Sequence, residues 1–137
     1  MNSKTLLGAL IAGIVSFLFG WLFFGILLMD YYSSNVIQYP GLIKNPPDIL
    51  PIAISNLALG VLISWVFDIG KIKTIAKGFS TGLILGLLIS LCFDLYIYGQ
   101  MNLYTIKLIA IDVTMNGILG GILGVVLGWW FKREIKS

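Results

Sequence analysis

Four long apolar segments decide what this chain can fold into. They run approximately over residues 5–29, 49–67, 79–99 and 106–131, and none of them contains more than two charged residues. About 20 residues at a rise of 1.5 Å each cross a hydrocarbon core of about 30 Å. Helices satisfy their own backbone hydrogen bonds in lipid, and no ten-residue alternating pattern suggests a barrel. We therefore expect an all-α fold, a transmembrane four-helix bundle that forms a single domain over residues 1–137.

The composition agrees with a lipid environment and excludes several classes of soluble protein. Only 11% of the residues are charged, whereas a soluble domain usually carries about 25%. The sequence has no histidine, and Cys92 is its single cysteine. Intrachain disulfides, thiolate zinc sites and histidine-based catalysis are therefore excluded. We expect no metal, no cofactor and no catalytic residue, and we interpret the chain as a protein that is not an enzyme.

Basic residues are distributed unevenly between the two ends of the expected bundle. Lys44 and Lys107 fall on one side, and the other seven fall on the side of both termini: Lys4, Lys71, Lys73, Lys77, Lys132, Arg133 and Lys136. This bias predicts cytoplasmic N- and C-termini in a bacterial-type inner membrane. Because the basic residues are dispersed, nucleic-acid binding is not predicted. The expected partners are the lipid bilayer and either further copies of the chain or the subunits of a membrane complex.

One connection is longer than the others and lies on the side opposite the termini. This outer loop covers residues 30–48 and contains the turn-forming segments Tyr39-Pro40-Gly41 and Asn45-Pro46-Pro47-Asp48. It is either a plain connection or a small amphipathic cover on the membrane surface. Asp48 stands where the second helix begins, and we expect it to cap that helix.

Small or polar residues recur at every fourth position of each span. The four series are Gly8, Ala12, Ser16 and Gly20; Asn56, Gly60, Ser64 and Asp68; Gly82, Gly86, Ser90 and Asp94; and Asp112, Asn116, Gly120, Gly124 and Gly128. Residues four apart share one helix face, so each helix presents a narrow seam. Helices in lipid associate by close backbone approach and interhelical hydrogen bonds. We expect the four seams to face one another inside the bundle or to form a contact between subunits of an oligomer, in the manner of a glycine zipper.

The two halves of the sequence resemble each other, which indicates an internal repeat. At an offset of 74 residues, four positions of the first span match four of the third: Gly8, Ser16, Phe19 and Gly25 with Gly82, Ser90, Phe93 and Gly99. At an offset of 60, Asn56 and Gly60 match Asn116 and Gly120. Each half is then a helical hairpin, and the two tandem hairpins share one orientation, as in transporters built from parallel repeats. The halves differ where Asp94 replaces Gly20 and Asp112 replaces Ile52.

Four polar residues on these seams form a candidate site: Asp94, Asp112, Asn56 and Asn116. The helical rise places both aspartates about 8–10 Å inside the outer interface, at a depth where the sequence has no basic residue. A charge near the middle of a membrane costs from ~2.5 to over 10 kcal/mol. Either one carboxylic acid stays protonated, or water or a cation enters from outside, with Tyr96 or Tyr98 adding hydrogen bonds. The structural alternative is that these groups only join the helices, at about 0.6 kcal/mol per hydrogen bond.

Two sequence runs resemble a known group of proteins. These are Gly20-Trp21-Leu22-Phe23-Phe24-Gly25 and the second-half run from Gly82 through Tyr98-Gly99 to Asp112 and Gly120. They are similar to small bacterial four-helix integral membrane proteins that are grouped as a domain of unknown function. The resemblance implies a fold and a location, and no activity.

Two functions remain open. The first is a non-enzymatic packing or accessory component of the membrane, working as an oligomer or within a complex. The second is a small proton- or cation-coupled transporter or channel with an outward-facing site at Asp94 and Asp112.

Overall fold

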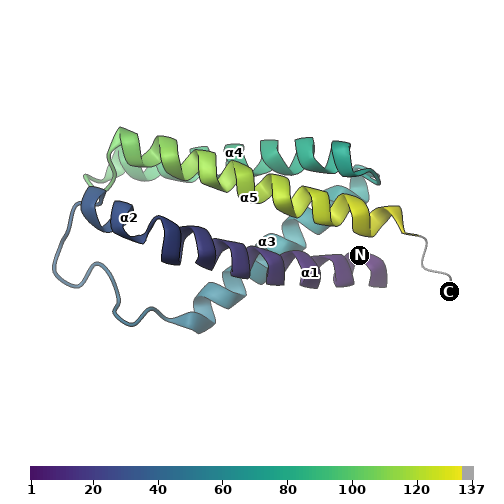
Figure 1. Ribbon diagram of the computed structural model, residues 1–137, viewed down its shortest axis with the longest axis horizontal. Helices are drawn as coiled ribbons and strands as arrows, with labels where there is room; N and C mark the ends of the chain where they lie inside the picture. The colour runs from purple at the N-terminus through teal and green to yellow at the C-terminus, as the bar shows by residue number, and fades with distance from the viewer. Residues whose placement is uncertain (134–137) are drawn as a thin grey trace.

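The computed structural model describes residues 1–133, and every regular element in that range is helical. In chain order these elements are α1 (Ser3–Gly20), the π-helix η1 (Trp21–Leu27), α2 (Met29–Asn35), α3 (Ile49–Ile69), α4 (Ile75–Gln100) and α5 (Ile106–Lys132) (Figure 1). Four stretches are long and apolar enough to cross a membrane: Ser3–Leu27, Ile49–Ile69, Ile75–Gln100 and Ile106–Lys132. The expected all-α class with four long apolar helices is confirmed.

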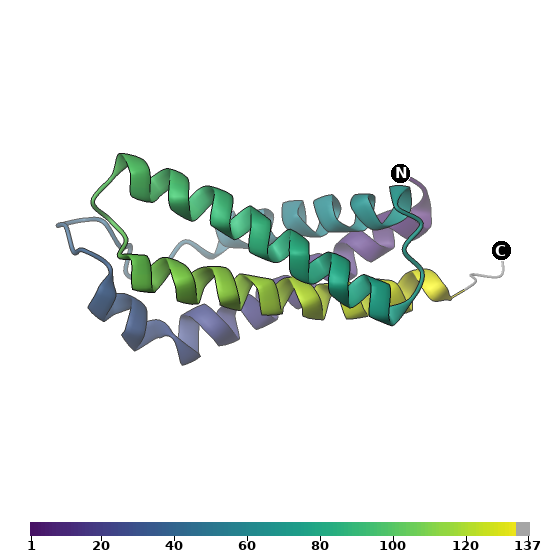
Figure 2. The ribbon, with the colours of Figure 1, turned by 90° about the horizontal axis from the view of Figure 1, so that it is seen from above.

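The long helices lie side by side as two pairs that correspond to the two halves of the sequence. α1 packs against α3, and α4 packs against α5 (Figures 1 and 2). α1 and α4 run in one direction, while α3 and α5 run in the other. The two pairs meet mainly through α1 and α5, and α3 makes only slight contact with α4 and α5. We call the end with the N-terminus and the C-terminus of α5 the terminal end, and the opposite end the loop end.

Glycines bring α4 and α5 into backbone contact. A Cβ on Gly120 would overlap the carbonyl oxygen of Gly82 and lie 3.0 Å from Cα of Gly86. Likewise, a Cβ on Gly82 would overlap the carbonyl oxygen of Gly120 and lie 2.9 Å from Cα of Gly124. Any side chain at these positions would force the helices apart, so the predicted seams explain why this pair packs so closely.

The seams do not all face one another, and this expectation is wrong. Instead, the seams are buried within the helix pairs, between α1 and α3 and between α4 and α5. In the first pair, Gly60 of α3 lies against the backbone of Ala9 and Gly13, which adjoin the predicted series, while Ser16 of that series donates to Asn56. Gly8 contacts both neighbours of α1, since a Cβ there would lie 2.8 Å from Oγ of Ser64 on α3 and 3.1 Å from the Trp130 ring on α5. The buried face of α1 is therefore wider than the predicted seam, because this helix contacts α3 and α5 at once.

The terminal end of the bundle is closed by an apolar core and by hydrogen bonds. The core takes residues from α1, α3, α5 and the turn after α3, namely Ala12, Ile63, Phe67, Ile72, Leu123, Leu127 and Phe131. Oγ of Ser64 donates to the carbonyl of Thr5 at 2.8 Å, and Nε1 of Trp130 donates to the carbonyl of Lys4 at 3.0 Å. Asp68 accepts a hydrogen bond from Oγ1 of Thr5 at 2.7 Å. These contacts hold α1, α3 and α5 together at this end.

The loop end is open by comparison, because α3 leans away. In Figure 1 the first turns of α3 lie below α1, on the far side from α4 and α5. The outer loop also differs from a plain connection, since its first part forms α2. Its second part is irregular but is tied to the α4–α5 connection by Ile37, whose amide donates to the carbonyl of Leu103 at 3.1 Å. Asp48 stands at the N-cap position of α3 as expected, but its side chain makes no capping hydrogen bond and pairs with Lys44 instead.

The first span is not a continuous α-helix. At Trp21 the α-helix widens into the π-helix η1, and the chain bends at Leu28 before α2 begins. The Trp21 ring lies over Gly25, where a Cβ would be only 2.5 Å from it. Single π turns within helices are frequent at functional sites because they redirect the following residues. Here the bend carries α2 across the loop end of α5.

Candidate functional site

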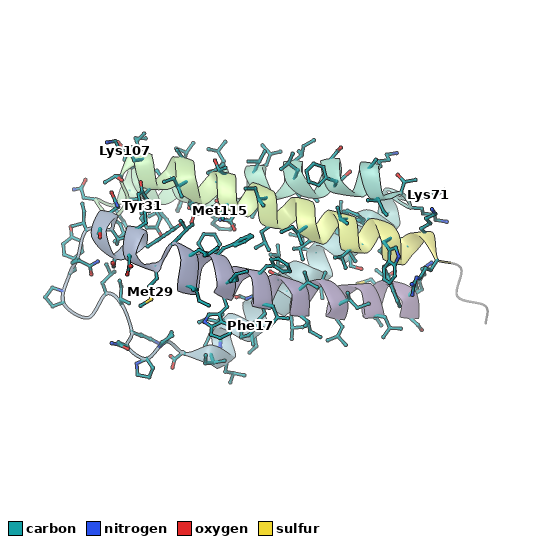
Figure 3. All side chains as sticks on the ribbon, in the orientation of Figure 1. Phe17, Met29, Tyr31, Lys71, Lys107 and Met115 are labelled. Atoms are coloured by element: carbon teal, nitrogen blue, oxygen red, sulfur yellow. The ribbon has the colours of Figure 1, made fainter. Side chains whose placement is uncertain are left out.

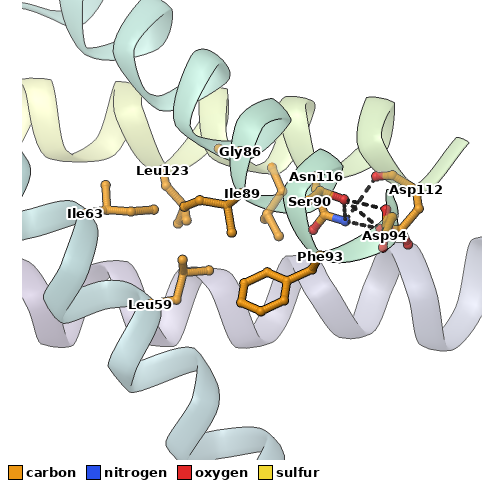
Figure 4. A pocket seen from close by; sticks show the side chains of 12 residues that line it. Leu59, Ile63, Gly86, Ile89, Ser90, Phe93, Asp94, Asp112, Asn116 and Leu123 are labelled. Atoms are coloured by element: carbon orange, nitrogen blue, oxygen red, sulfur yellow. Dashed lines mark hydrogen bonds between the residues drawn. The ribbon is translucent and has the colours of Figure 1, made fainter. Parts of the chain in front are cut away.

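Five polar side chains meet at the loop end between α4, α5 and α2. α4 contributes Ser90 and Asp94, α5 contributes Asp112 and Asn116, and α2 contributes Tyr32. We call these five residues the acid cluster. α4 and α5 each supply two residues one turn apart on the seam that continues from their glycines, so the close glycine contact brings the two polar pairs together (Figure 4). Asp94 is only 8% exposed.

The two carboxyl groups share a single hydroxyl. Oγ of Ser90 lies 2.9 Å from Oδ2 of Asp94 and 2.8 Å from Oδ2 of Asp112. Nδ2 of Asn116 donates to Oδ2 of Asp112 at 2.7 Å and lies 3.2 Å from Oγ of Ser90. The hydroxyl of Tyr32 donates to the other oxygen of Asp112. All five residues therefore belong to one hydrogen-bonded network.

Counting protons assigns a charge state to this network. The Ser90 hydroxyl carries one proton and can donate to only one of the two carboxyl groups that it contacts. The second short oxygen–oxygen contact requires a proton on a carboxyl group, because two acceptors at hydrogen-bond distance repel each other. Asp112 has two further donors, Tyr32 and Asn116, whereas the hydrogen-bond partners of Asp94 within residues 1–133 are Ser90 and the Asp112 carboxyl group itself. The arrangement thus favours an ionised Asp112 and a protonated Asp94.

Two tyrosines close the loop-end side of the acid cluster. Burial and the neighbouring Asp112 raise the pKa of the Tyr32 hydroxyl above its ordinary value. Burial, Asp94 and Asp112 likewise raise the pKa of Tyr104. Both hydroxyls therefore stay neutral, and that of Tyr32 donates to Asp112. Within residues 1–133 the one salt bridge joins Lys44 to Asp48, so the acid cluster has no basic partner there.

The tyrosines expected to serve the site are different ones. Tyr96 and Tyr98 are 65% and 45% exposed and are not part of the hydrogen-bond network described for the acid cluster. Tyr32 takes the role that was expected of them. It lies beyond the first span, and only the bend after η1 brings it over Asp112. No helical spacing therefore predicts that Tyr32 belongs to the site.

Asn56 is the one predicted site residue that stands apart from the acid cluster. Its Oδ1 accepts a hydrogen bond from Ser16 at 2.6 Å, and its Nδ2 donates to the carbonyl of Ile52 at 2.8 Å. The expected convergence of all four residues is wrong for Asn56, because α3 leans away at the loop end. The contact is nevertheless informative, since the predicted internal repeat aligns Ser16 and Asn56 with Ser90 and Asn116.

Two cavities adjoin the acid cluster. The first has a volume of about 240 Å³ and ends at Ser90, Asp94, Asp112 and Asn116. Its remaining wall is apolar and consists of Leu59, Ile63, Gly86, Ile89, Phe93, Leu119, Gly120 and Leu123 (Figure 4). The second, of about 480 Å³, lies between α1, η1 and α3 and shares Leu59, Asn116 and Leu119 with the first. Asn56 and Asn116 therefore face the same space although they do not touch.

Known proteins give no further guide to the site. No protein family, curated protein or solved structure matches the chain. The resemblance to small bacterial four-helix membrane proteins therefore stays a prediction, and the function has to be argued from the acid cluster and its cavities.

The predicted packing residues between α4 and α5 lie next to the acid cluster, on the same helix faces. Gly82, Gly86, Gly120 and Gly124 lie between α4 and α5, and Gly60 lies between α1 and α3. All five are in backbone contacts within the chain, which leaves their seams covered. An oligomer remains a prediction, but these glycines no longer supply a surface for it.

Proposed function

We propose that this chain is a small proton-coupled cation carrier of the membrane, in which the acid cluster exchanges one proton for one cation. The observation that carries the proposal is the Ser90 hydroxyl, which lies within 2.9 Å of two carboxyl groups inside the apolar spans. One proton satisfies this arrangement, and its loss leaves a negative charge without a donor.

The electrostatics of the pair give the exchange its driving force. Both carboxyl oxygens contact the same Oγ, so they are at most about 6 Å apart, and two like charges at that distance repel by about 3 kcal/mol at an effective dielectric constant of 20. Loss of the proton from Asp94 creates that repulsion. A cation in the adjoining cavity removes it, as does the return of the proton. Proton and cation therefore compete for the same carboxylate.

The membrane and orientation belong to the same proposal. Figure 3 places Lys71 at the terminal end and Lys107 at the loop end. Seven of the nine basic residues belong to the terminal side by their sequence position. With the terminal end in the cytoplasm of a bacterial-type cell, as the positive-inside rule favours, the acid cluster lies in the outer half of the inner membrane.

A second candidate function is a packing or accessory component of a membrane complex. The observation in its favour is that, within residues 1–133, every buried side-chain nitrogen and oxygen has a hydrogen-bond partner. A fully satisfied network is what interhelical hydrogen bonds that only join helices require. In this second function, the protonated carboxyl group only joins α4 to α5 by hydrogen bonds and does not exchange its proton.

Proton flux in proteoliposomes separates the two functions. The full chain is reconstituted with a pH-sensitive dye inside, and a panel of inorganic and organic cations is added outside in turn. The carrier predicts that at least one cation moves protons across the membrane, that Asp94→Asn abolishes this movement, and that Asp48→Asn in the exposed loop retains it. Absence of cation-linked proton movement in the wild-type protein with every cation would reject the carrier and favour the accessory component.

A further inference from the structure

The cavity beside the acid cluster indicates which kind of cation the protein carries. We propose that the substrate is a monovalent organic cation with an apolar body, such as a substituted quaternary ammonium ion. This inference rests on the proposed carrier function and adds the substrate class.

The wall of the cavity is the first argument. Inorganic cations such as Ca²⁺ and Mg²⁺ require about six or more oxygen ligands. Here the polar groups are confined to one end of the cavity, and no third acidic or sulfur ligand joins Asp94 and Asp112 within the described chain. An organic cation is weakly hydrated and needs a charge partner and an apolar surface rather than a shell of oxygens. The cavity offers both at opposite ends.

An aromatic ring beside the acids is the second argument. Phe93 directly precedes Asp94 in the sequence, and its side chain lines the cavity with Leu59 and Ile89 (Figure 4). Aromatic faces attract cations, and recognition of quaternary ammonium groups is the usual functional form of this interaction. The ring and the two carboxyl groups thus line one cavity and can share one positive charge.

Size is the third argument. A dry cavity of about 150 Å³ holds benzene, so a volume of about 240 Å³ has room for a benzene ring with a small ammonium group. A longer apolar body can extend past Leu59 into the adjoining cavity of about 480 Å³, which carries the aromatic residues Phe17, Trp21 and Phe24. Because α3 leans away at this end, a molecule dissolved in the bilayer can reach the space from the side.

The exchange balances in charge and atoms. The organic cation enters, the O–H bond of the Asp94 carboxylic acid breaks, and one proton leaves to water while the cation pairs with the carboxylate. The titratable groups facing Asp94 are Asp112 from α5, Tyr32 from α2 and Tyr104 from the connection before α5. The tyrosines stay neutral, so one proton is released for each cation bound. Below the pH at which this proton is released, the affinity falls about tenfold for each unit of pH.

A charged ligand and its neutral counterpart test the inference. The full chain in detergent micelles and weak buffer is titrated with benzyltrimethylammonium, while a pH indicator reports proton release and calorimetry reports binding. Neopentylbenzene, in which carbon replaces the nitrogen, has the same shape without the charge. We expect saturable binding of the cation with one proton released, and at least tenfold weaker binding of the hydrocarbon without proton release. Equal affinity for both ligands would overturn the inference.

Two matched variants locate the binding. Leu59→Trp fills the space that both cavities share and should weaken benzyltrimethylammonium binding at least tenfold. Leu62→Trp adds the same side chain to an exposed position of the same helix and should leave binding within twofold. Thermal unfolding of both variants shows that they are folded. Equal binding by the two variants would place the ligand elsewhere and overturn the inference.

Inorganic cations separate failure of the substrate class from failure of the carrier. If Na⁺ or K⁺ releases a proton through Asp94 and benzyltrimethylammonium does not, the substrate class is wrong and the carrier stands. If benzyltrimethylammonium binds with the same affinity to Asp94→Asn and no cation releases a proton, both the substrate class and the proton exchange are wrong. If proton release with benzyltrimethylammonium is lost in Asp94→Asn, both are supported.

Discussion

The two helix pairs of this protein are both antiparallel and close-packed, but they carry different polar groups at the loop end. In the first pair Ser16 donates to Asn56 at 2.6 Å, and in the second Asn116 lies 3.2 Å from Ser90. The predicted repeat aligns these positions, and a serine–asparagine contact joins the helices in each pair, with serine the donor in the first and asparagine in the second. In the first pair it stands alone. In the second it is extended by Asp94 and Asp112, where the first pair has Gly20 and Ile52.

The two pairs also differ in how closely their helices pack near the loop end. α4 and α5 meet through glycines on both helices up to the acid cluster, so the backbone is held close where the carboxyl groups face each other. α1 and α3 are close at Gly60, but a Cβ on Gly20 would be 4.0 Å from Oδ1 of Asn56. The comparison teaches that one pair provides a rigid polar site while the other opens the cavity beside it. The first pair therefore serves as an internal control for the second.

The largest expected effect is on the close contact of α4 with α5. Gly120→Val places a side chain against the backbone of Gly82 and Gly86, and we expect it to destabilise the protein by about 3 kcal/mol or more, the upper range for overpacking. Thermal unfolding in detergent measures the change. Gly99→Val, at a helical position where a Cβ meets nothing within 4 Å, should change stability by less than about 0.5 kcal/mol. Equal effects of the two substitutions would contradict the rigid second pair.

The next effect concerns the proton that distinguishes the acid cluster from its counterpart in the first pair. Infrared spectroscopy of the wild-type protein near neutral pH should show the carbonyl band of one protonated carboxylic acid. Asp94→Asn should remove this band completely, because Asp112 remains ionised by its donors Tyr32 and Asn116. Asp48→Asn should leave the band unchanged. Persistence of the band in Asp94→Asn would show that the proton resides elsewhere.

A smaller effect is expected from the tyrosine that has no counterpart in the first pair. Tyr32→Phe removes one donor from the Asp112 carboxylate, and such charge-assisted hydrogen bonds contribute about 1.5–3 kcal/mol. The acid cluster should then hold its proton more tightly, so the pH of half-maximal cation binding should rise by about one to two units. A titration of cation binding against pH measures the change. Tyr31→Phe on the same helix is the control, and an equal rise in both variants would remove Tyr32 from the site.

Much of this arrangement could be predicted from the sequence, because an α-helix fixes which residues share a face. The four spans followed from apolar length. Spacing by four placed Asp94 with Ser90 and Asp112 with Asn116, and the glycines on the same faces indicated that these pairs could meet. Such features depend on one helix at a time, or on one close contact between two helices.

The remaining features depend on how the helix pairs are placed relative to each other. Asn56 carries the same spacing signal as Asn116, but the tilt of α3 separates it from the acid cluster. Tyr32 lies outside the first span, and its position depends on a π turn that no periodic pattern in the sequence marks. On α1, Ala9 is buried as well as Gly8 because that helix contacts two others. Tilt, bend and rotation are set by all the contacts together.

The smallest effect tests whether the isolated serine–asparagine contact only joins helices. Ser16→Ala removes one interhelical hydrogen bond, which costs about 0.6 kcal/mol in membrane proteins, and should leave proton release unchanged. Ser90→Ala removes the hydroxyl that links two carboxyl groups, so it should alter proton release as well as stability. Unfolding and proton titration of the two variants make the comparison. If Ser16→Ala changed proton release as much as Ser90→Ala, the two halves would share one function, and the acid cluster could not be the feature that separates them.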